Sequence, residues 1–147
     1  MEPSTPNFPA TDPRCEVQPI LLVDDDPTFR SALAAILAGD GHAVHDYGAP
    51  SEVPTLATLG HIAAVITDYE MPGENGLAFA DRFHAAHPRV PVVLVTGHRM
   101  RQLEDQAATR EFLYLLRKPI DYDELHALLH LVWAGAHRER SSVSRVA

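Results

Sequence analysis

The sequence has little of what disulfide-bonded, membrane or nucleic-acid-binding proteins require. It contains one cysteine, Cys15, so no disulfide can form within the chain. No apolar run approaches the ~18 residues of a membrane span, and the first residues lack the basic and apolar stretches of a signal peptide. Basic residues are few, with 12 Lys and Arg against 20 Asp and Glu and a net charge of −8, whereas nucleic-acid surfaces need a basic patch. We therefore expect a cytoplasmic protein with neither a nucleic-acid nor a membrane partner.

What the sequence does have is enough material for one folded domain. Its 147 residues are 46% hydrophobic and 22% charged, the profile of a globular protein with a single core. Residues 1–17 carry four prolines among polar residues, which predicts a disordered arm. We place the domain at residues 18–137 and expect a flexible polar tail at residues 138–147.

Between these tails, strand and helix patterns alternate five times. Short apolar runs predict buried strands, and apolar residues at helical spacing predict helices. The predicted strands are 20–23, 42–47, 61–68, 90–97 and 111–119. Five helices are predicted. The first begins at Pro27 and the third at Gly76. The second spans 50–60 with an interruption at Pro54, and the fourth and fifth span 99–108 and 121–137. This alternation predicts an α/β fold, a parallel sheet with helices on both faces.

Polar side chains stand where the predicted strands end. Asp24, Asp25 and Asp26 follow the first strand, Asp68 ends the third, Thr96 the fourth, and Lys118 follows the fifth. In parallel sheets, function gathers at the carboxyl ends of the strands. Carboxylates on one small face repel one another unless a cation joins them, and oxygen ligands suit Mg²⁺. A nucleophile, a metal and a positive charge are the components of a phosphoryl-transfer site.

Four stretches in this order carry a family resemblance: "ILLVDDDP", "VITDYEMPGENGL", "PVVLVTG" and "RKPI". The chain resembles the receiver domains of two-component response regulators over about residues 18–137. The resemblance implies a flavodoxin-like fold, a five-stranded parallel sheet of order 2-1-3-4-5 flanked by five helices. It also implies a stand-alone regulator or a piece of a longer protein that signals through phosphorylation.

The resemblance also implies a role for each site residue. Asp68 would accept the phosphoryl group, and Mg²⁺ would be held by Asp24, Asp25, Asp68 and the backbone carbonyl of Glu70. Thr96 and Lys118 would contact the phosphoryl group, with Gly97, His98 and Pro119 as accessory residues. The donor would be a sensor histidine kinase or a histidine phosphotransfer protein, and a downstream protein partner would receive the signal. The Lys118–Pro119 peptide bond is expected to be cis.

Two features bear on the output and the lifetime of the signal. The family's mobile aromatic residue corresponds to Leu115, so an aromatic switch is in doubt. Glu70 and His98 would border the path of the water that removes the phosphoryl group. An ion pair between them would prolong the signal at low pH, or both would simply point into solvent.

Other functions remain open from the residues alone. "DDDPT", residues 24–28, also fits a haloacid-dehalogenase-like phosphatase, with Asp24 as nucleophile and Asp26 as acid/base. That alternative leaves Asp68 without a role. A receiver-like interaction module without phosphate turnover is a third possibility, against which the intact set of site residues argues.

The last predicted helix carries a second pattern beside its leucine stripe. His126, His130, Trp133 and His137 lie on one side of it. His126 and His130 are four residues apart, as zinc ligands can be, but no HExxH motif or cysteine accompanies them, which favours a solvated face. A partner or homodimer surface through this helix is the functional alternative to an ordinary flank.

Overall fold

The computed structural model describes residues 18–55, 59–97 and 100–143 of the chain. The expected Pro-rich arm at 1–17, His98 and residues 144–147 lie outside the described residues. So do the side chains of residue 100 and of residues 135–143, including His137.

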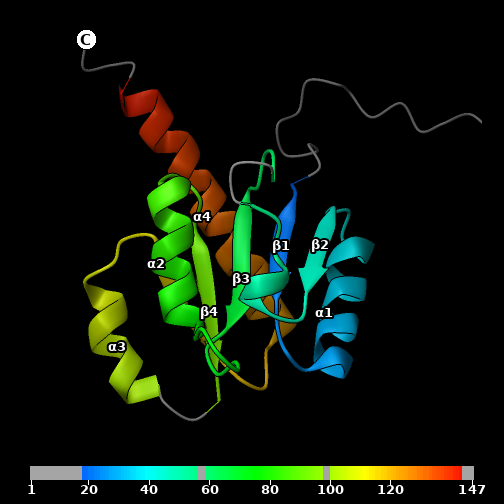
Figure 1. Cartoon of the computed structure of the whole chain (residues 1–147). Helices are drawn as coiled ribbons and strands as arrows, with labels where there is room; N and C mark the ends of the chain where they lie inside the picture. Colours follow the sequence, from blue (N-terminus) through cyan, green and yellow to red (C-terminus); the bar gives the residue numbers. More distant parts are fainter. Residues whose placement is uncertain (1–17, 56–58, 98–99, 144–147) are drawn as a thin grey trace, which may run out of the picture.

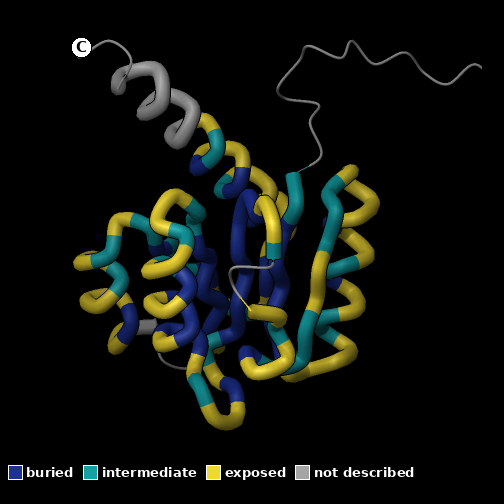
Figure 2. The backbone as a smooth tube through the Cα atoms, turned by 45° about the horizontal axis from the view of Figure 1, so that its top comes forward, coloured by how far each residue is buried: buried dark blue, intermediate teal, exposed yellow. Residues whose placement is uncertain are grey.

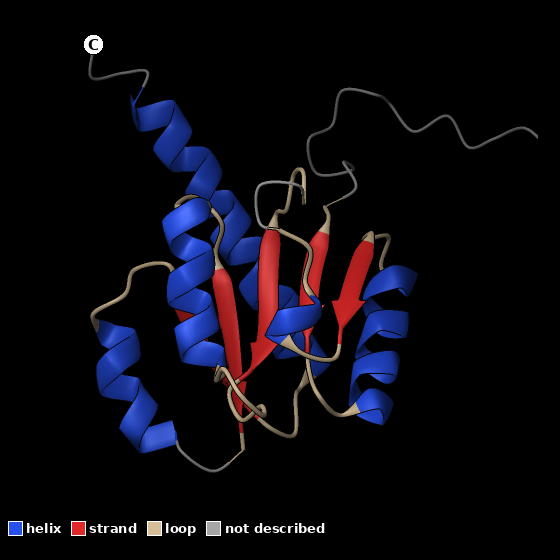
Figure 3. Cartoon of the chain, in the orientation of Figure 1, coloured by secondary structure: helices blue, strands red, loops and turns tan. Residues whose placement is uncertain are grey.

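Five parallel strands form one sheet with the order β2-β1-β3-β4-β5, as the resemblance implies (Figure 3). The strands are β1 (Ile20–Val23), β2 (Val44–Tyr47), β3 (Ala64–Asp68), β4 (Val92–Thr96) and β5 (Leu113–Arg117). Every residue of β1, β3 and β4 is buried, whereas β2 and β5, at the edges, are partly exposed. The continuous apolar runs therefore mark the central strands, which are covered on both faces.

Four α-helices, within the described residues, cover the sheet (Figure 1). They are α1 (Pro27–Gly39), α2 (Gly76–Ala86), α3 (Met100–Ala108) and α4 (Tyr122–Val143). The helices α1 and α4 pack on one face of the sheet, and α2 and α3 on the other. This three-layer arrangement is the predicted doubly wound fold.

Alternate residues of each strand supply the two core layers. In β1, Ile20 and Leu22 face α1 and α4, whereas Leu21 and Val23 face α2 and α3. Figure 2 shows the buried positions concentrated along the strands and the exposed ones on the outer sides of the helices. The two-residue periodicity of the strands thus fixes which side chains reach which helix layer. The residues that end or follow the strands are free to form a site at the carboxyl ends of the strands.

The expected helix at residues 50–60 does not form as predicted. The described part of this segment has one short 3₁₀ turn, η1 (Pro50–Glu52). Val53 precedes Pro54 and adopts an extended backbone, with φ −67° and ψ 129°, because the proline ring disfavours a helical residue before it. The part of the chain that the structure describes therefore has four α-helices where five helices were predicted.

The last helix is longer than predicted. It continues past residue 137 to Val143. The charged residues after 137 predict a polar tail by composition, but polar residues propagate a helix as well as apolar ones do. The domain boundaries themselves stay predictions.

Candidate functional site: an acidic cluster at the carboxyl edge of the sheet

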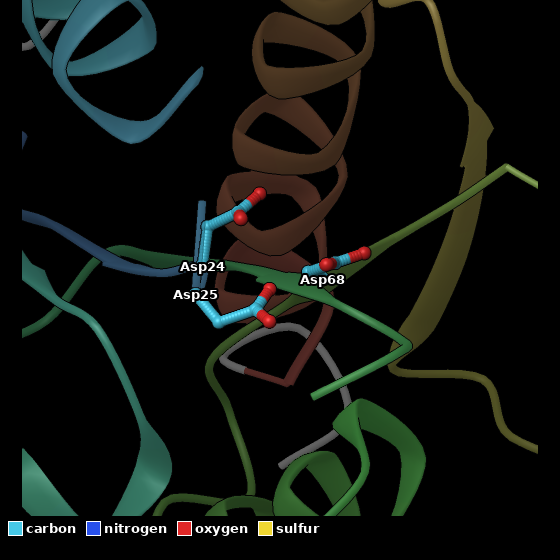
Figure 4. Close-up of side chains that lie close together, drawn as sticks. All are labelled: Asp24, Asp25 and Asp68. Carbon is cyan, nitrogen blue, oxygen red and sulfur yellow. The ribbon is translucent and has the colours of Figure 1, made fainter. Parts of the chain in front are cut away.

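The two central strands bring three aspartates together. Asp24 and Asp25 follow β1, and Asp68 is the last residue of the neighbouring β3. Carboxylate oxygens of all three lie within 4.8 Å of one another (Figure 4). Asp24 is 1% exposed and Asp68 8%, whereas Asp25 is open to solvent. The predicted acidic residues therefore form one cluster with an accessible side.

Lys118 places its ammonium group beside this cluster. Its Nζ lies 3.4 Å from Asp24 Oδ2 and 3.5 Å from Asp68 Oδ1. The peptide bond to Pro119 is cis, as expected, and the Lys118 amide donates to the Thr96 carbonyl oxygen across 2.9 Å. The turn after β5 thus holds the lysine against the ends of the central strands.

The cluster carries more negative charge than one lysine balances. The pKa of Asp68 is raised to about 6, first by burial and then by the charges of Asp24 and Asp25, against the opposing effect of Lys118. Burial likewise raises the pKa of Asp24, although the Asp26 amide and Lys118 lower it. Both shifts mean that ionised carboxylates are unfavourable here without another cation. The site therefore fits a hard divalent ion such as Mg²⁺, which prefers oxygen ligands.

Thr96 supplies a hydroxyl that has no hydrogen-bond partner among the described residues. Its side chain is 1% exposed, and its Oγ1 makes no hydrogen bond with any described residue. A buried polar atom left in this state costs roughly 1–3 kcal/mol. The hydroxyl is thus available to a ligand that enters the cluster.

Asp26 does not join the cluster. Its carboxylate caps α1 by accepting hydrogen bonds from the amides of Thr28 and Phe29, at 3.0 and 3.2 Å. Its own amide donates to Asp24 Oδ1 across 2.8 Å. The helix-cap interpretation of Asp26 is therefore correct, and this residue supports the site only by positioning Asp24.

The loop from β3 to α2 is tightly closed behind Asp68. The Gly76 amide donates to the Tyr69 carbonyl oxygen across 2.8 Å, and Asn75 caps α2 by accepting from the Ala78 amide. A Cβ atom at Gly76 would overlap the backbone oxygen of Asp68, so only glycine fits. Glu70 is exposed on this loop, beside a shallow depression that the loop lines.

Two residues of the site were missed from the sequence. The Lys118 Nζ lies 4.4 Å from the centre of the Phe29 ring, at a cation–π distance. Arg30 donates from Nη1 to the Asp24 carbonyl oxygen across 2.7 Å. Both stand on the first turn of the helix that the acidic run begins. That proximity in sequence is the one signal that could have indicated them.

Doubly wound topology and an acidic cluster with an adjacent lysine define the class of receiver-like α/β proteins. The family model for the response regulator receiver domain matches residues 20–130. The chain therefore belongs to the response regulator receiver family of two-component signalling.

Similar regulators from bacteria agree with this assignment. The chain is 32% identical over 108 residues to the DNA-binding transcriptional regulator NtrC of Klebsiella pneumoniae, covering 74% of this chain and 23% of that protein. It is 31% identical over 106 residues to the C4-dicarboxylate transport transcriptional regulatory protein DctD of Rhizobium meliloti, covering 72% and 23%. The chain thus spans about a quarter of the length of the curated relatives that it matches.

Solved structures show the same fold. A receiver domain protein from Clostridium thermocellum is 26% identical, with a TM-score of 0.71 over 84% of this chain and 98% of that one. NtrX from Brucella abortus is 26% identical, with a TM-score of 0.77 over 90% of this chain and 30% of that one.

Receiver domains are in general phosphoacceptors rather than enzymes, and the phosphatase alternative gains no support from any comparison. The described residues contain no helix long and apolar enough to cross a membrane. The prediction of no nucleic-acid partner stays a prediction, since the relatives include regulators named as DNA-binding.

Proposed function

We propose that this receiver domain accepts a phosphoryl group on Asp68 from a phosphohistidine of a sensor histidine kinase or a histidine phosphotransfer protein. The observation that carries the proposal is the meeting of three carboxylates within 4.8 Å with a lysine 3.4–3.5 Å from two of them. Among the three, Asp68 is the one that ends a central strand with its pKa raised to about 6. A carboxylate that the site stabilises poorly is a reactive nucleophile.

The transfer conserves the phosphoryl group. An Asp68 carboxylate oxygen attacks phosphorus, a new O–P bond forms, and the P–N bond of the phosphohistidine breaks. The bonding electrons stay with the departing imidazole, which takes up a proton. Hydrolysis by water later returns inorganic phosphate and the free carboxylate, so the domain performs phosphotransfer and autodephosphorylation on itself alone.

A magnesium ion would be held by Asp24, Asp25, Asp68 and the backbone carbonyl of Glu70. When bound, it supplies charge neutralisation at the transferring phosphoryl oxygens. The raised pKa values of Asp24 and Asp68 support this assignment, because burial and the neighbouring carboxylates disfavour the ionised forms, which a bound cation would stabilise.

Lys118 and Thr96 would bind the phosphoryl oxygens. The ammonium of Lys118 already lies beside the Asp68 carboxylate, and the Thr96 hydroxyl has no other described partner. Donation from Thr96 to a phosphoryl oxygen would draw the end of β4 inward, and Gly97, His98 and Pro119 would accommodate the change. The resulting shift in α3, β5 and α4 would alter the binding of a downstream protein, or of a second copy through α4.

Intact-mass analysis after incubation with acetyl phosphate and Mg²⁺ tests the proposal. We expect one added phosphoryl group on the wild-type chain and none after EDTA treatment or in Asp68→Asn. Asp105→Asn is a matched control, because Asp105 is an exposed acid on α3 outside the cluster. It should be modified as the wild type is.

Two results would contradict the proposal. One is a phosphoryl group that persists in Asp68→Asn and disappears in Asp24→Asn, which is the pattern of the phosphatase alternative. The other is a folded wild-type chain that takes up no phosphoryl group from either acetyl phosphate or phosphoramidate.

A further inference from the structure

A pair of histidines on α4 lies apart from the acidic cluster and has no part in the proposed phosphotransfer. His126 and His130 are exposed, and their Nε2 atoms lie 3.1 Å apart. The ring centroids are 4.4 Å apart with an interplanar angle of 65°. Both imidazoles are therefore open to solvent, as the sequence favours, and their Nε2 atoms also face each other.

We propose that His126 and His130 form a binding site for a divalent transition metal such as Zn²⁺ or Cu²⁺. In a tetrahedral site with Zn–N bonds of about 2.0–2.1 Å, two ligand nitrogens lie roughly 3.3 Å apart. The separation of 3.1 Å is within a few tenths of an ångström of that value. A small rotation of either side chain would fit the ion, with no movement of the helix.

Asp40 lies where it would favour the tautomer of His126 that binds a metal. Its Oδ2 lies 3.8 Å from His126 Nδ1, the ring nitrogen that does not face His130. A carboxylate on Nδ1 favours the tautomer with the proton at that atom, which leaves the Nε2 lone pair free for a metal. Asp40 caps the far end of α1, about 20 Å along that 13-residue helix from Asp26.

A third imidazole, that of His42, and the fluorescent indole of Trp133 lie near the histidine pair. The His42 ring lies 5.3 Å from the Trp133 ring, and the Trp133 ring lies 6.1 Å from the His130 ring. Trp133 is fixed by donating from Nε1 to the Ala63 carbonyl oxygen across 3.1 Å. It is also the single tryptophan of the chain, so tryptophan fluorescence reports on the surroundings of this one side chain.

The ligand set separates this site from the magnesium site. Imidazole nitrogens bind Zn²⁺ and Cu²⁺ well, whereas Mg²⁺ prefers oxygen. Within the described residues, the one group of three or more potential ligands that could surround an ion is the aspartate cluster. The histidine pair therefore supplies two ligands, and water would complete the coordination.

Quenching of Trp133 fluorescence by Cu²⁺ tests the proposal. The protein should carry no histidine tag, and excess Mg²⁺ should be present to occupy the aspartate cluster. We expect saturable quenching at one ion per chain, reversed by EDTA. His126→Ala and His130→Ala should each raise the half-quenching concentration at least tenfold, and Asp40→Asn should raise it several-fold.

His45→Ala is the matched control, because His45 is an exposed histidine on β2. Its neighbour Val44 packs toward α1 and α4, and adjacent residues of a strand face opposite sides of the sheet, so His45 faces away from the α4 pair. It should shift the half-quenching concentration less than twofold. Circular dichroism checks the fold of each variant, which should persist because both replaced rings are exposed. Thermal unfolding with Zn²⁺ gives a second readout: Tm should rise in the wild type and in His45→Ala, but not in either α4 variant. Equal quenching and equal Zn²⁺ stabilisation in His126→Ala, His130→Ala and wild type would overturn the proposal.

Discussion

Asp68 is a carboxyl group whose ionised form the fold disfavours. Burial acts first, and the neighbouring charges of Asp24 and Asp25 add to it, so its pKa rises from 3.8 to about 6. Lys118 opposes the shift without cancelling it. Residues whose pKa is shifted in this way are typical of functional sites.

This shift predicts how the charge of Asp68 affects stability. Between pH 3.8 and about 6 the folded chain holds a proton that the unfolded chain has released. Stability from this group is therefore fully present below pH 3.8 and is lost as pH rises through 6. Without divalent ions at pH 7.5, Asp68→Asn should be more stable than wild type by on the order of 2 kcal/mol.

Urea unfolding in EDTA at pH 4.5 and pH 7.5 measures the effect. The advantage of Asp68→Asn should shrink at pH 4.5, because the wild-type carboxyl group is then largely protonated. Mg²⁺ at pH 7.5 should reduce it as well. An advantage that grows as the pH falls would show that the Asp68 charge is not destabilising in the folded chain.

Asp24 and Asp26, just before α1, have different roles. Asp24 faces the cluster, whereas Asp26 caps the helix through the amides of Thr28 and Phe29. Removing such a cap costs about 1 kcal/mol, and serine caps as well as aspartate does. Asp26 therefore has a structural role as the N-cap of α1.

Substitution of Asp26 tests that assignment. Asp26→Ala should lower the free energy of unfolding by about 1 kcal/mol, and Asp26→Ser should restore most of the loss. Both variants should take up phosphoryl groups from acetyl phosphate at rates within about threefold of wild type. A loss of phosphorylation above tenfold in Asp26→Ser would instead indicate chemistry at Asp26, as in the phosphatase alternative.

The helices show where sequence patterns fail to determine structure. The segment 50–60 has apolar residues at plausible spacing, but Pro54 limits it to one 3₁₀ turn in its described part. The composition predicts an end of the last helix at residue 137, whereas α4 continues to Val143, because composition does not distinguish a polar tail from a polar helix. The contact of His126 with Asp40 joins residues 86 positions apart (126 − 40), so no local pattern contains it.

For the molecule as a whole, the fold brings distant strand ends to one edge of the sheet. Lys118 and Asp24 are 94 positions apart in the chain yet form a contact of 3.4 Å. The buried strands could be predicted, since central parallel strands need continuous apolar runs. The residues at their ends could be predicted too, because the carboxyl ends of parallel strands share one edge. The cation–π contact of Lys118 with Phe29 could not, because it depends on side-chain packing.

Under the proposed function, Asp68 and no other aspartate carries the phosphoryl group. Borohydride reduces an acyl phosphate to an alcohol, so a phosphorylated aspartate becomes homoserine. The chain should be treated with acetyl phosphate and Mg²⁺, reduced, digested and sequenced by tandem mass spectrometry. We predict homoserine at position 68 and aspartate at positions 24, 25 and 26. Homoserine at position 24, or at no position in a chain whose intact mass shows a phosphoryl group, would contradict the account.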